Sequence, residues 1–157
     1  MSLLVRNLLI GGVLMWLGLA AAYLGPFFSR QAGILPEDFY VKKSAERLVK
    51  GDWLRAQTVI NRGLTHFPRC ANLYFNLGLS YYLSGDYPKA RATFEKLIDI
   101  NPYYPDVHYL LGRMYQTDGN YPCAKQEFIR ELNVNPGNPR AWDQIQQNKR
   151  ISLHTTP

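Results

Sequence analysis

The sequence predicts an all-α protein in which one amino-terminal membrane helix precedes a stack of helical hairpins and a carboxyl-terminal capping helix. Three observations lead to this prediction: a long apolar run near the amino terminus, residue types that recur every 34 positions in the rest of the chain, and glycine and proline residues placed as helix ends. The 157 residues are enough to bury one core of ordinary size.

The apolar run covers residues 8–28 and contains no charged side chain or histidine. A helix rises about 1.5 Å per residue, so this run supplies the roughly 20 residues that a bilayer span requires. We therefore predict a membrane anchor over residues 1–29 and a linker over residues 30–36. The alternative is a cleaved secretory signal, because Ala20 and Ala22 are spaced like a cleavage site. The length of the run favours the anchor.

Small residues mark one face of the predicted anchor. Three glycines spaced by seven residues share that face, with one alanine four residues beyond the second glycine, and the set comprises Gly11, Gly18, Ala22 and Gly25. Such residues let two membrane helices approach closely. We therefore expect another transmembrane helix as one partner, in addition to the membrane itself.

Basic residues flank the predicted anchor unevenly. Arg6 alone precedes it, whereas the following segment carries Arg30, Lys42, Lys43, Arg47 and Lys50. Lysine and arginine near a span tend to stay in the cytoplasm, so we expect a single-pass protein whose carboxyl-terminal domain is cytoplasmic. A periplasmic domain is the alternative, because an amino-terminal signal anchor often keeps its own amino terminus inside.

The 34-residue recurrence predicts three hairpins, at residues 37–70, 71–104 and 105–138. Each predicted turn has a glycine, a polar capping residue and an aromatic residue in succession, and each second helix has an alanine and is followed by a proline. The matching columns are Gly51, Gly85 and Gly119; Asp52, Asp86 and Asn120; Trp53, Tyr87 and Tyr121; Ala56, Ala90 and Ala124; Pro68, Pro102 and Pro136. A capping helix over residues 139–150 and a flexible tail over residues 151–157 complete the prediction.

These repeats resemble the tetratricopeptide-repeat family. The second repeat supplies the family pattern as Tyr74, Leu77, Gly78, Tyr81, Ala90, Phe94 and Pro102, and the third as His108, Leu111, Gly112, Tyr115, Ala124, Phe128 and Pro136. The first repeat departs from it in its first helix, as a terminal repeat without an upstream neighbour should. The resemblance implies an α-solenoid of about three helix-turn-helix repeats with a concave groove for partner segments.

The resemblance also implies which side chains line that groove. They are Asn72, Phe75, Asn76, Leu79 and Tyr82 in the second repeat, and Asp106, Tyr109, Arg113 and Gln116 in the third. Family members that bind the acidic tails of chaperones do so through specific residues at five positions of the repeats. In this chain those positions hold Val41, Ala45, Asn76, Asp106 and Leu110, and of these only Asn76 matches the family residue. We therefore expect a hydrophobic peptide or amphipathic helix as the occupant, with Arg113 as a polar anchor. The alternative is that some of these side chains pack between repeats.

The sequence carries no pattern typical of catalysis. It lacks a glycine-rich phosphate loop, a nucleophile elbow and a metal-ligand spacing around its three histidines. We therefore expect no cofactor and no metal. The basic residues behind the net charge of +6 are interspersed with acidic ones, so no nucleic acid is expected either. We expect a non-enzymatic scaffold or adaptor, as an assembly factor or accessory subunit of a membrane protein complex. A soluble periplasmic or secreted factor is the alternative.

Overall fold

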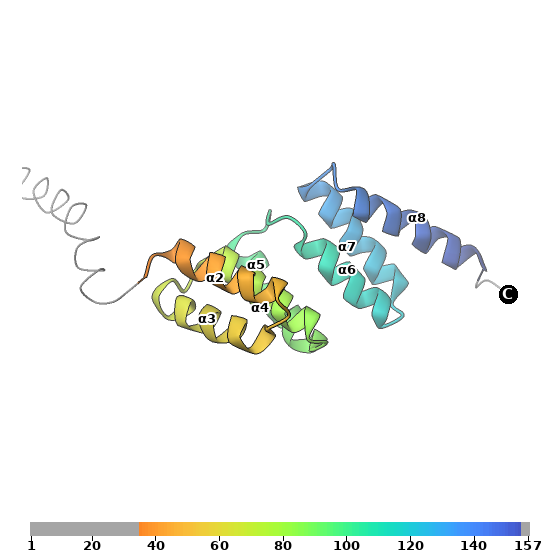
Figure 1. Cartoon of the computed structure of the whole chain (residues 1–157). Coiled ribbons are helices and arrows are strands. Elements are labelled where there is room, and N and C mark those ends of the chain that lie inside the picture. The colour runs from red at the N-terminus through yellow and green to blue at the C-terminus, as the bar shows by residue number, and fades with distance from the viewer. Residues whose placement is uncertain (1–34, 155–157) are drawn as a thin grey trace, which may run out of the picture. The chain divides into compact units, whose positions relative to one another are not determined.

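The computed structural model describes residues 35–154, which form a succession of α-helices without a strand (Figure 1). The helices are α2 (Glu37–Val49), α3 (Trp53–His66), α4 (Ala71–Leu83), α5 (Tyr87–Ile100), α6 (Val107–Thr117), α7 (Tyr121–Val134) and α8 (Pro139–His154). The predicted anchor over residues 1–29 and its small-residue face lie outside the described residues. Within residues 35–154, no helix is both long and apolar enough to cross a bilayer.

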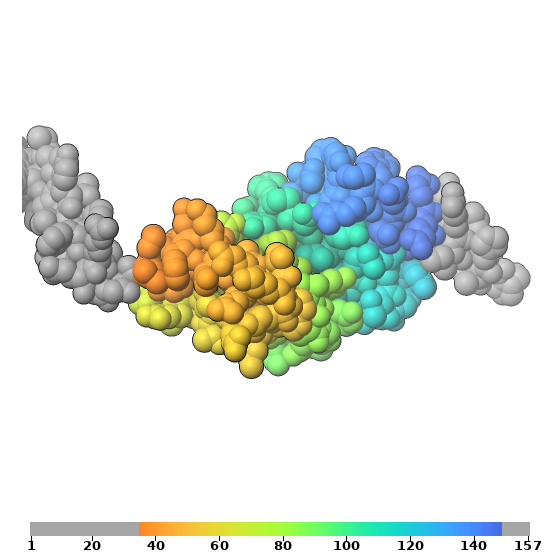
Figure 2. Space-filling model, viewed as in Figure 1, coloured from red at the N-terminus to blue at the C-terminus, as the bar shows by residue number. Residues whose placement is uncertain are grey.

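Helices α4 and α5 form one antiparallel hairpin and α6 and α7 form the next, with α8 packed on α7. The first hairpin, α2 and α3, packs through α3 on α4. The hairpins follow one another in chain order, as the gradient of colour along the surface in Figure 2 shows. The prediction of an all-α stack of helical hairpins is therefore confirmed for the described residues.

The predicted turn chemistry is present in all three hairpins. The three turn glycines, Gly51, Gly85 and Gly119, have positive φ angles of 73°, 83° and 73°, which glycine adopts without steric cost. The following Asp52, Asp86 and Asn120 each accept a hydrogen bond from the backbone N–H three residues on, at the start of the second helix. The polar residue therefore caps the second helix while glycine ends the first.

Close packing inside each hairpin depends on a glycine opposite a phenylalanine. Gly78 on α4 lies against the ring of Phe94 on α5, and Gly112 on α6 lies against Phe128 on α7. Both rings are completely buried. A Cβ atom at Gly78 would lie 2.5 Å from Phe94 Cε1, and one at Gly112 would lie 2.6 Å from Phe128 Cε1. The absence of a side chain at these two glycines therefore lets the helices of each hairpin pack closely.

Two element boundaries differ from the sequence prediction. Helix α8 continues to His154, past the predicted end at residue 150, because residues 151–154 contain neither glycine nor proline to stop it. Helix α6 begins only at Val107, because Asp106 before it has a positive φ of 66° that is incompatible with a helix. The cause of that backbone conformation lies in the contacts of Asp106, described below.

Candidate partner-binding face

The predicted groove residues of the second repeat differ in exposure. Asn72 is exposed, whereas Phe75, Leu79 and Tyr82 are half-buried on α4. The Phe75 ring stacks on Tyr104 at 5.1 Å between centroids, and the Tyr104 hydroxyl donates a hydrogen bond of 2.8 Å to Asn72 Oδ1. Burial raises the pKa of the Tyr104 hydroxyl above its ordinary value. Tyr104, in the loop after α5, was missed by the sequence reasoning.

Asn76 has a structural position between the first two repeats. Its side chain is buried, and its amide nitrogen donates to Ser44 Oγ at 2.8 Å and to the Val41 carbonyl at 3.2 Å, both on α2. An asparagine amide has two N–H donors, so both are used within the protein. The one side chain that matches the chaperone-tail pattern is therefore engaged between α4 and α2.

Tyr109 on α6 is contacted by two arginines, the predicted Arg113 on the same helix and Arg140 on α8. The Tyr109 side chain is 8% exposed and its ring packs on Phe128 at 5.8 Å, so it belongs to the core as well as to the predicted face. Arg113, four residues later and thus on the same side of the helix, donates a hydrogen bond of 3.3 Å from Nη1 to the Tyr109 hydroxyl. Arg140 from α8 lies over the Tyr109 ring, with its Cζ atom 4.8 Å from the centroid. Two guanidinium groups therefore approach one tyrosine.

Tyr82 and Tyr87 extend this arrangement toward the second repeat. Their ring centroids are 5.6 Å apart. Burial raises the pKa of the Tyr82 hydroxyl, and the positive charge of Arg113 opposes that shift. The hydrogen bond to Tyr109 raises the pKa of the Arg113 guanidinium, and the Tyr82 and Tyr87 hydroxyls act in the same direction. We call Tyr82, Tyr87, Tyr109, Arg113 and Arg140 the tyrosine–arginine patch.

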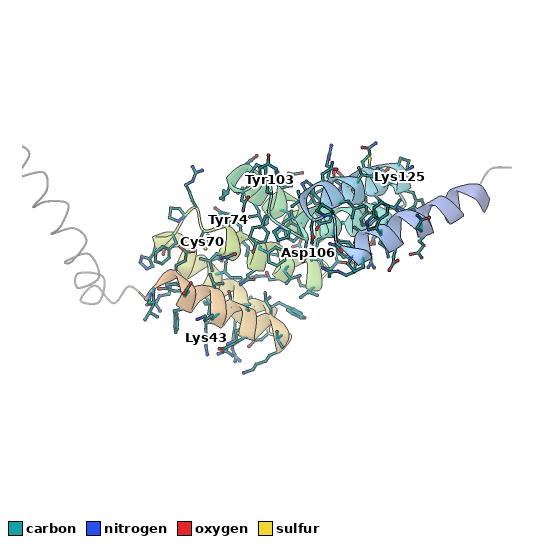
Figure 3. All side chains as sticks on the ribbon, turned by 90° about the horizontal axis from the view of Figure 1, so that it is seen from above. Lys43, Cys70, Tyr74, Tyr103, Asp106 and Lys125 are labelled. Carbon is teal, nitrogen blue, oxygen red and sulfur yellow. The ribbon has the colours of Figure 1, made fainter. Side chains whose placement is uncertain are left out.

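Asp106 is held by a polar network rather than left free at the face. The buried Glu131 of α7 accepts hydrogen bonds from the backbone N–H groups of Asp106, at 2.9 Å, and Tyr109, at 3.3 Å. Asn138 donates to both carboxylates, and Arg140 forms an ion pair with Asp106. Glu131 thus supplies the acceptor that a capping side chain would otherwise offer to α6. These bonds fix the left-handed backbone of Asp106, whose position between the second and third hairpins is labelled in Figure 3.

Gln116 also bonds within the protein. Its amide nitrogen donates to Gln144 Oε1 and Asn148 Oδ1, both at 2.8 Å, and so ties α6 to α8. Of the nine predicted groove residues, Asn76, Asp106 and Gln116 thus have bonding roles between helices. Arg113 differs from them. Among the described residues it has no carboxylate partner, and Tyr109 is its recorded hydrogen-bond partner.

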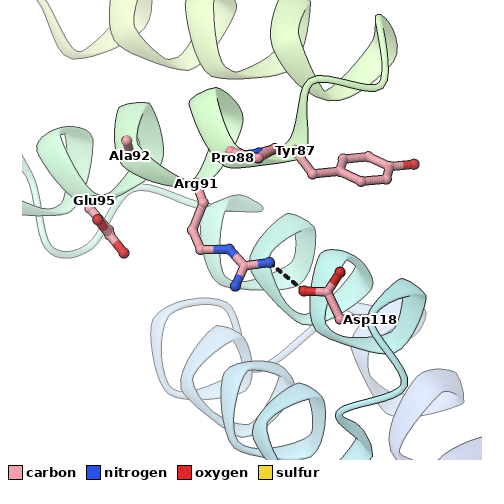
Figure 4. A pocket seen from close by; sticks show the side chains of 6 residues that line it. All are labelled: Tyr87, Pro88, Arg91, Ala92, Glu95 and Asp118. Carbon is pink, nitrogen blue, oxygen red and sulfur yellow. Dashed lines mark hydrogen bonds and ion pairs between the residues drawn. The ribbon is translucent and has the colours of Figure 1, made fainter.

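Two cavities lie along the seam between α5 and α6. One, of about 470 Å³, is lined by Asp118 and by α5 residues that include Tyr87. Arg91 forms an ion pair of 2.6 Å with Asp118, which is drawn in Figure 4. The second, of about 370 Å³, is lined by side chains of α5, α6 and α7, including His108 and Glu127. Neither contains a residue of the predicted groove.

His108 occupies the aromatic column of its repeat and is buried, as packing predicts. Its Nδ1 atom lies 2.8 Å from Glu127 Oε2, and Arg130 forms an ion pair with the same carboxylate. This buried pair could not be predicted from sequence, because the two residues lie 19 positions apart in different helices. The described part of the chain contains no cluster of His, Cys, Asp and Glu that could hold a metal ion.

Two models of the tetratricopeptide repeat match the chain, over residues 45–105 and 81–147, and together they span more than half of it. This chain belongs to the tetratricopeptide-repeat family. The repeat is a protein–protein interaction fold and is typically non-enzymatic. No curated protein matches the chain.

Solved structures of tetratricopeptide-repeat domains superimpose on most of the chain. The first such domain of Spaghetti (RPAP3), bound to the HSP90 peptide SRMEEVD, has a TM-score of 0.68 at 16% identity and covers 74% of this chain and 93% of that one. The second domain of human RPAP3, in complex with an HSP70 peptide, has a TM-score of 0.63 at 21% identity and covers 73% of this chain and 98% of that one. PilF of Pseudomonas aeruginosa has a TM-score of 0.66 at 15% identity and covers 74% of this chain and 54% of that one. At these identities the likeness shows the fold.

Proposed function

We propose that this chain is a membrane-anchored scaffold or adaptor that holds a segment of a partner protein on the face formed by α4, α6 and α8. The observation that carries the proposal is the tyrosine–arginine patch, in which Arg113 is exposed and has no carboxylate partner among the described residues. Aromatic and arginine side chains dominate the energetics of many protein interfaces. Domains of the same fold that hold HSP90 and HSP70 peptides support this class of function.

Membrane attachment is part of the proposal, with the repeats on the cytoplasmic side and the chain acting as an assembly factor or accessory subunit of a membrane complex. Its support is the uncharged run of residues 8–28 and the excess of basic residues after it. The alternative, a soluble periplasmic or secreted factor, follows if the run is a cleaved signal. Amino-terminal sequencing of the mature protein and protease protection in spheroplasts separate the two.

The partner proposal is tested by affinity purification of the full-length chain in mild detergent, comparing Tyr82→Ala with Tyr103→Ala. Tyr82 is half-buried in the patch, whereas Tyr103 is 77% exposed in the loop after α5 and is not one of the predicted groove residues. We expect Tyr82→Ala to lose a partner that the unaltered chain and Tyr103→Ala both retain. Equal recovery of the partner by both variants would overturn the proposed location.

A further inference from the structure

We propose that the partner segment carries an internal acidic side chain, flanked by an aromatic or aliphatic residue, and that its carboxylate bonds to Arg113. This inference rests on the proposed function, because it names the chemistry of the occupant of the same face. Its starting point is a contrast between the two arginines of the patch. Arg140 already has the Asp106 carboxylate, whereas no carboxylate of the described chain pairs with Arg113.

Arg113 is held in place before any partner arrives. Its hydrogen bond to the Tyr109 hydroxyl fixes one nitrogen of the guanidinium group, and Tyr109 itself is anchored by Phe128 and Arg140. A guanidinium has five N–H donors, so several remain for an incoming group. A carboxylate suits these free donors, because it accepts two parallel hydrogen bonds from one arginine and carries the opposite charge.

The surroundings of Arg113 define the rest of the occupant. The rings of Tyr82 and Tyr87 lie together beside it and are apolar on their faces, and Leu83 at the end of α4 is 45% exposed. An aromatic or aliphatic side chain next to the acid would cover these surfaces and exclude water from the ion pair. Exclusion of water strengthens a charge pair that would contribute little at an open surface.

The structure favours an internal acid over a free carboxyl terminus with its own acidic residues. A doubly acidic tail needs several neighbouring donors, whereas in the described part of the chain Arg113 is the one arginine of the patch without a carboxylate partner. The amide of Asn76 is fully used between α4 and α2. Arg140 is already paired with the Asp106 carboxylate, so its charge is not free for a second acid of the tail. A single acid at Arg113 avoids both obstacles.

The experiment is a selection of random 12-residue peptides on the full-length chain in mild detergent. The peptides are displayed between fixed linkers in one library and with a free carboxyl terminus in a second. Enriched sequences are synthesised with amidated ends, as matched versions with Glu or Gln at the acidic position, and their affinities are measured by fluorescence anisotropy. We expect enriched peptides to share an acid next to an aromatic or aliphatic residue, and the Glu version to bind about tenfold more tightly than the Gln version.

Arg113→Gln should abolish this tenfold preference, and Arg113→Lys should retain part of it, because lysine keeps the charge without the planar pair of donors. The matched control is Arg62→Gln, an exposed arginine on α3 that is absent from the patch and should leave the preference unchanged. Added salt should weaken the Glu version more than the Gln version.

Each other outcome has a distinct meaning. Peptides that bind the unaltered chain but not Tyr82→Ala, and that carry no acid or bind Arg113→Gln equally well, would overturn this inference and leave the proposed function standing. Acids enriched only when the peptide is displayed with a free carboxyl terminus would overturn the internal position. A failure to enrich any peptide would overturn both proposals.

Discussion

Replacing Gly78 by alanine tests the packing at the centre of the second hairpin. The added Cβ atom would lie 2.5 Å from Cε1, 2.7 Å from Cδ1 and 2.8 Å from Cζ of Phe94. All three distances are shorter than van der Waals contact. Because Phe94 is completely buried, its ring can move only by displacing the side chains around it. The substitution therefore overpacks the core.

Two opposing contributions set the magnitude. Overpacking a well-filled core costs about 1 to 3 kcal/mol, whereas alanine has an advantage over glycine of about 1 kcal/mol inside a helix. Since three ring atoms of Phe94 are approached at once, we expect the overpacking to prevail. The free energy of unfolding should fall by about 1 to 2 kcal/mol. For a domain of this size the melting temperature should then fall by about 4 to 8 °C.

The assay is thermal unfolding of the full-length chain in detergent, followed by circular dichroism. Gly137→Ala is the matched control, because a Cβ atom there meets nothing within 4 Å and its φ is not positive. In a Phe94→Leu background, the cost of Gly78→Ala should shrink, whereas the cost of Gly112→Ala, which faces Phe128, should not. A Gly78→Ala variant that melts together with Gly137→Ala would refute the packing described here.

Three further predictions follow from buried polar groups and thiols. Glu131→Ala should lower the free energy of unfolding by about 2 to 4 kcal/mol, because two backbone N–H groups and Asn138 lose their acceptor. Hydrogen exchange at residues 106–109 should accelerate, and unchanged protection there would contradict the capping role of Glu131. Asn76→Ala should lower the melting temperature more than Asn72→Ala, because of the two only Asn76 bonds to α2. Equal melting temperatures of the two variants would contradict this role of Asn76. Cys123 is exposed and Cys70 buried, so a thiol reagent should label Cys123 in the native state and Cys70 only on unfolding; equally rapid labelling of both would argue against the stack.

The stack of hairpins could be predicted from sequence because its determinants are local and repeated. The glycine, cap and aromatic residues of each turn recur at the same offset. In the structure each turn glycine has a positive φ, and each cap residue accepts the same backbone hydrogen bond. The approach of Gly78 to Phe94 was likewise foreseeable, since small and large residues in facing helices must compensate each other.

The candidate site could be predicted only in part, because the family pattern assigns faces and not bonding partners. It placed Tyr109 and Arg113 together, but it could not show that Asn76 and Gln116 bond to neighbouring helices. Those bonds depend on which polar residue happens to stand opposite. The same reasoning could have predicted Arg140, because it lies 34 residues after Asp106 and occupies the same repeat position in α8.

The late start of α6 could not be predicted, because its cause lies far away in the chain. Glu131, a completely buried carboxylate, stands in a column that holds Gly63 and Leu97 in the other repeats. A charged residue in that column suggests a surface position, and only the fold shows that it reaches the first turn of α6. The left-handed Asp106 follows from these bonds.

Site-specific photocrosslinking in intact membranes tests the central claim most directly, namely that the face with the tyrosine–arginine patch holds a partner protein. A benzophenone amino acid would replace Tyr82 on α4 in one variant and Tyr103, which is 77% exposed in the loop after α5, in another. We predict one discrete crosslinked partner from position 82, lost when Arg113→Gln is added, and none from position 103. The same adducts from both positions, or no adduct from position 82, would contradict the account.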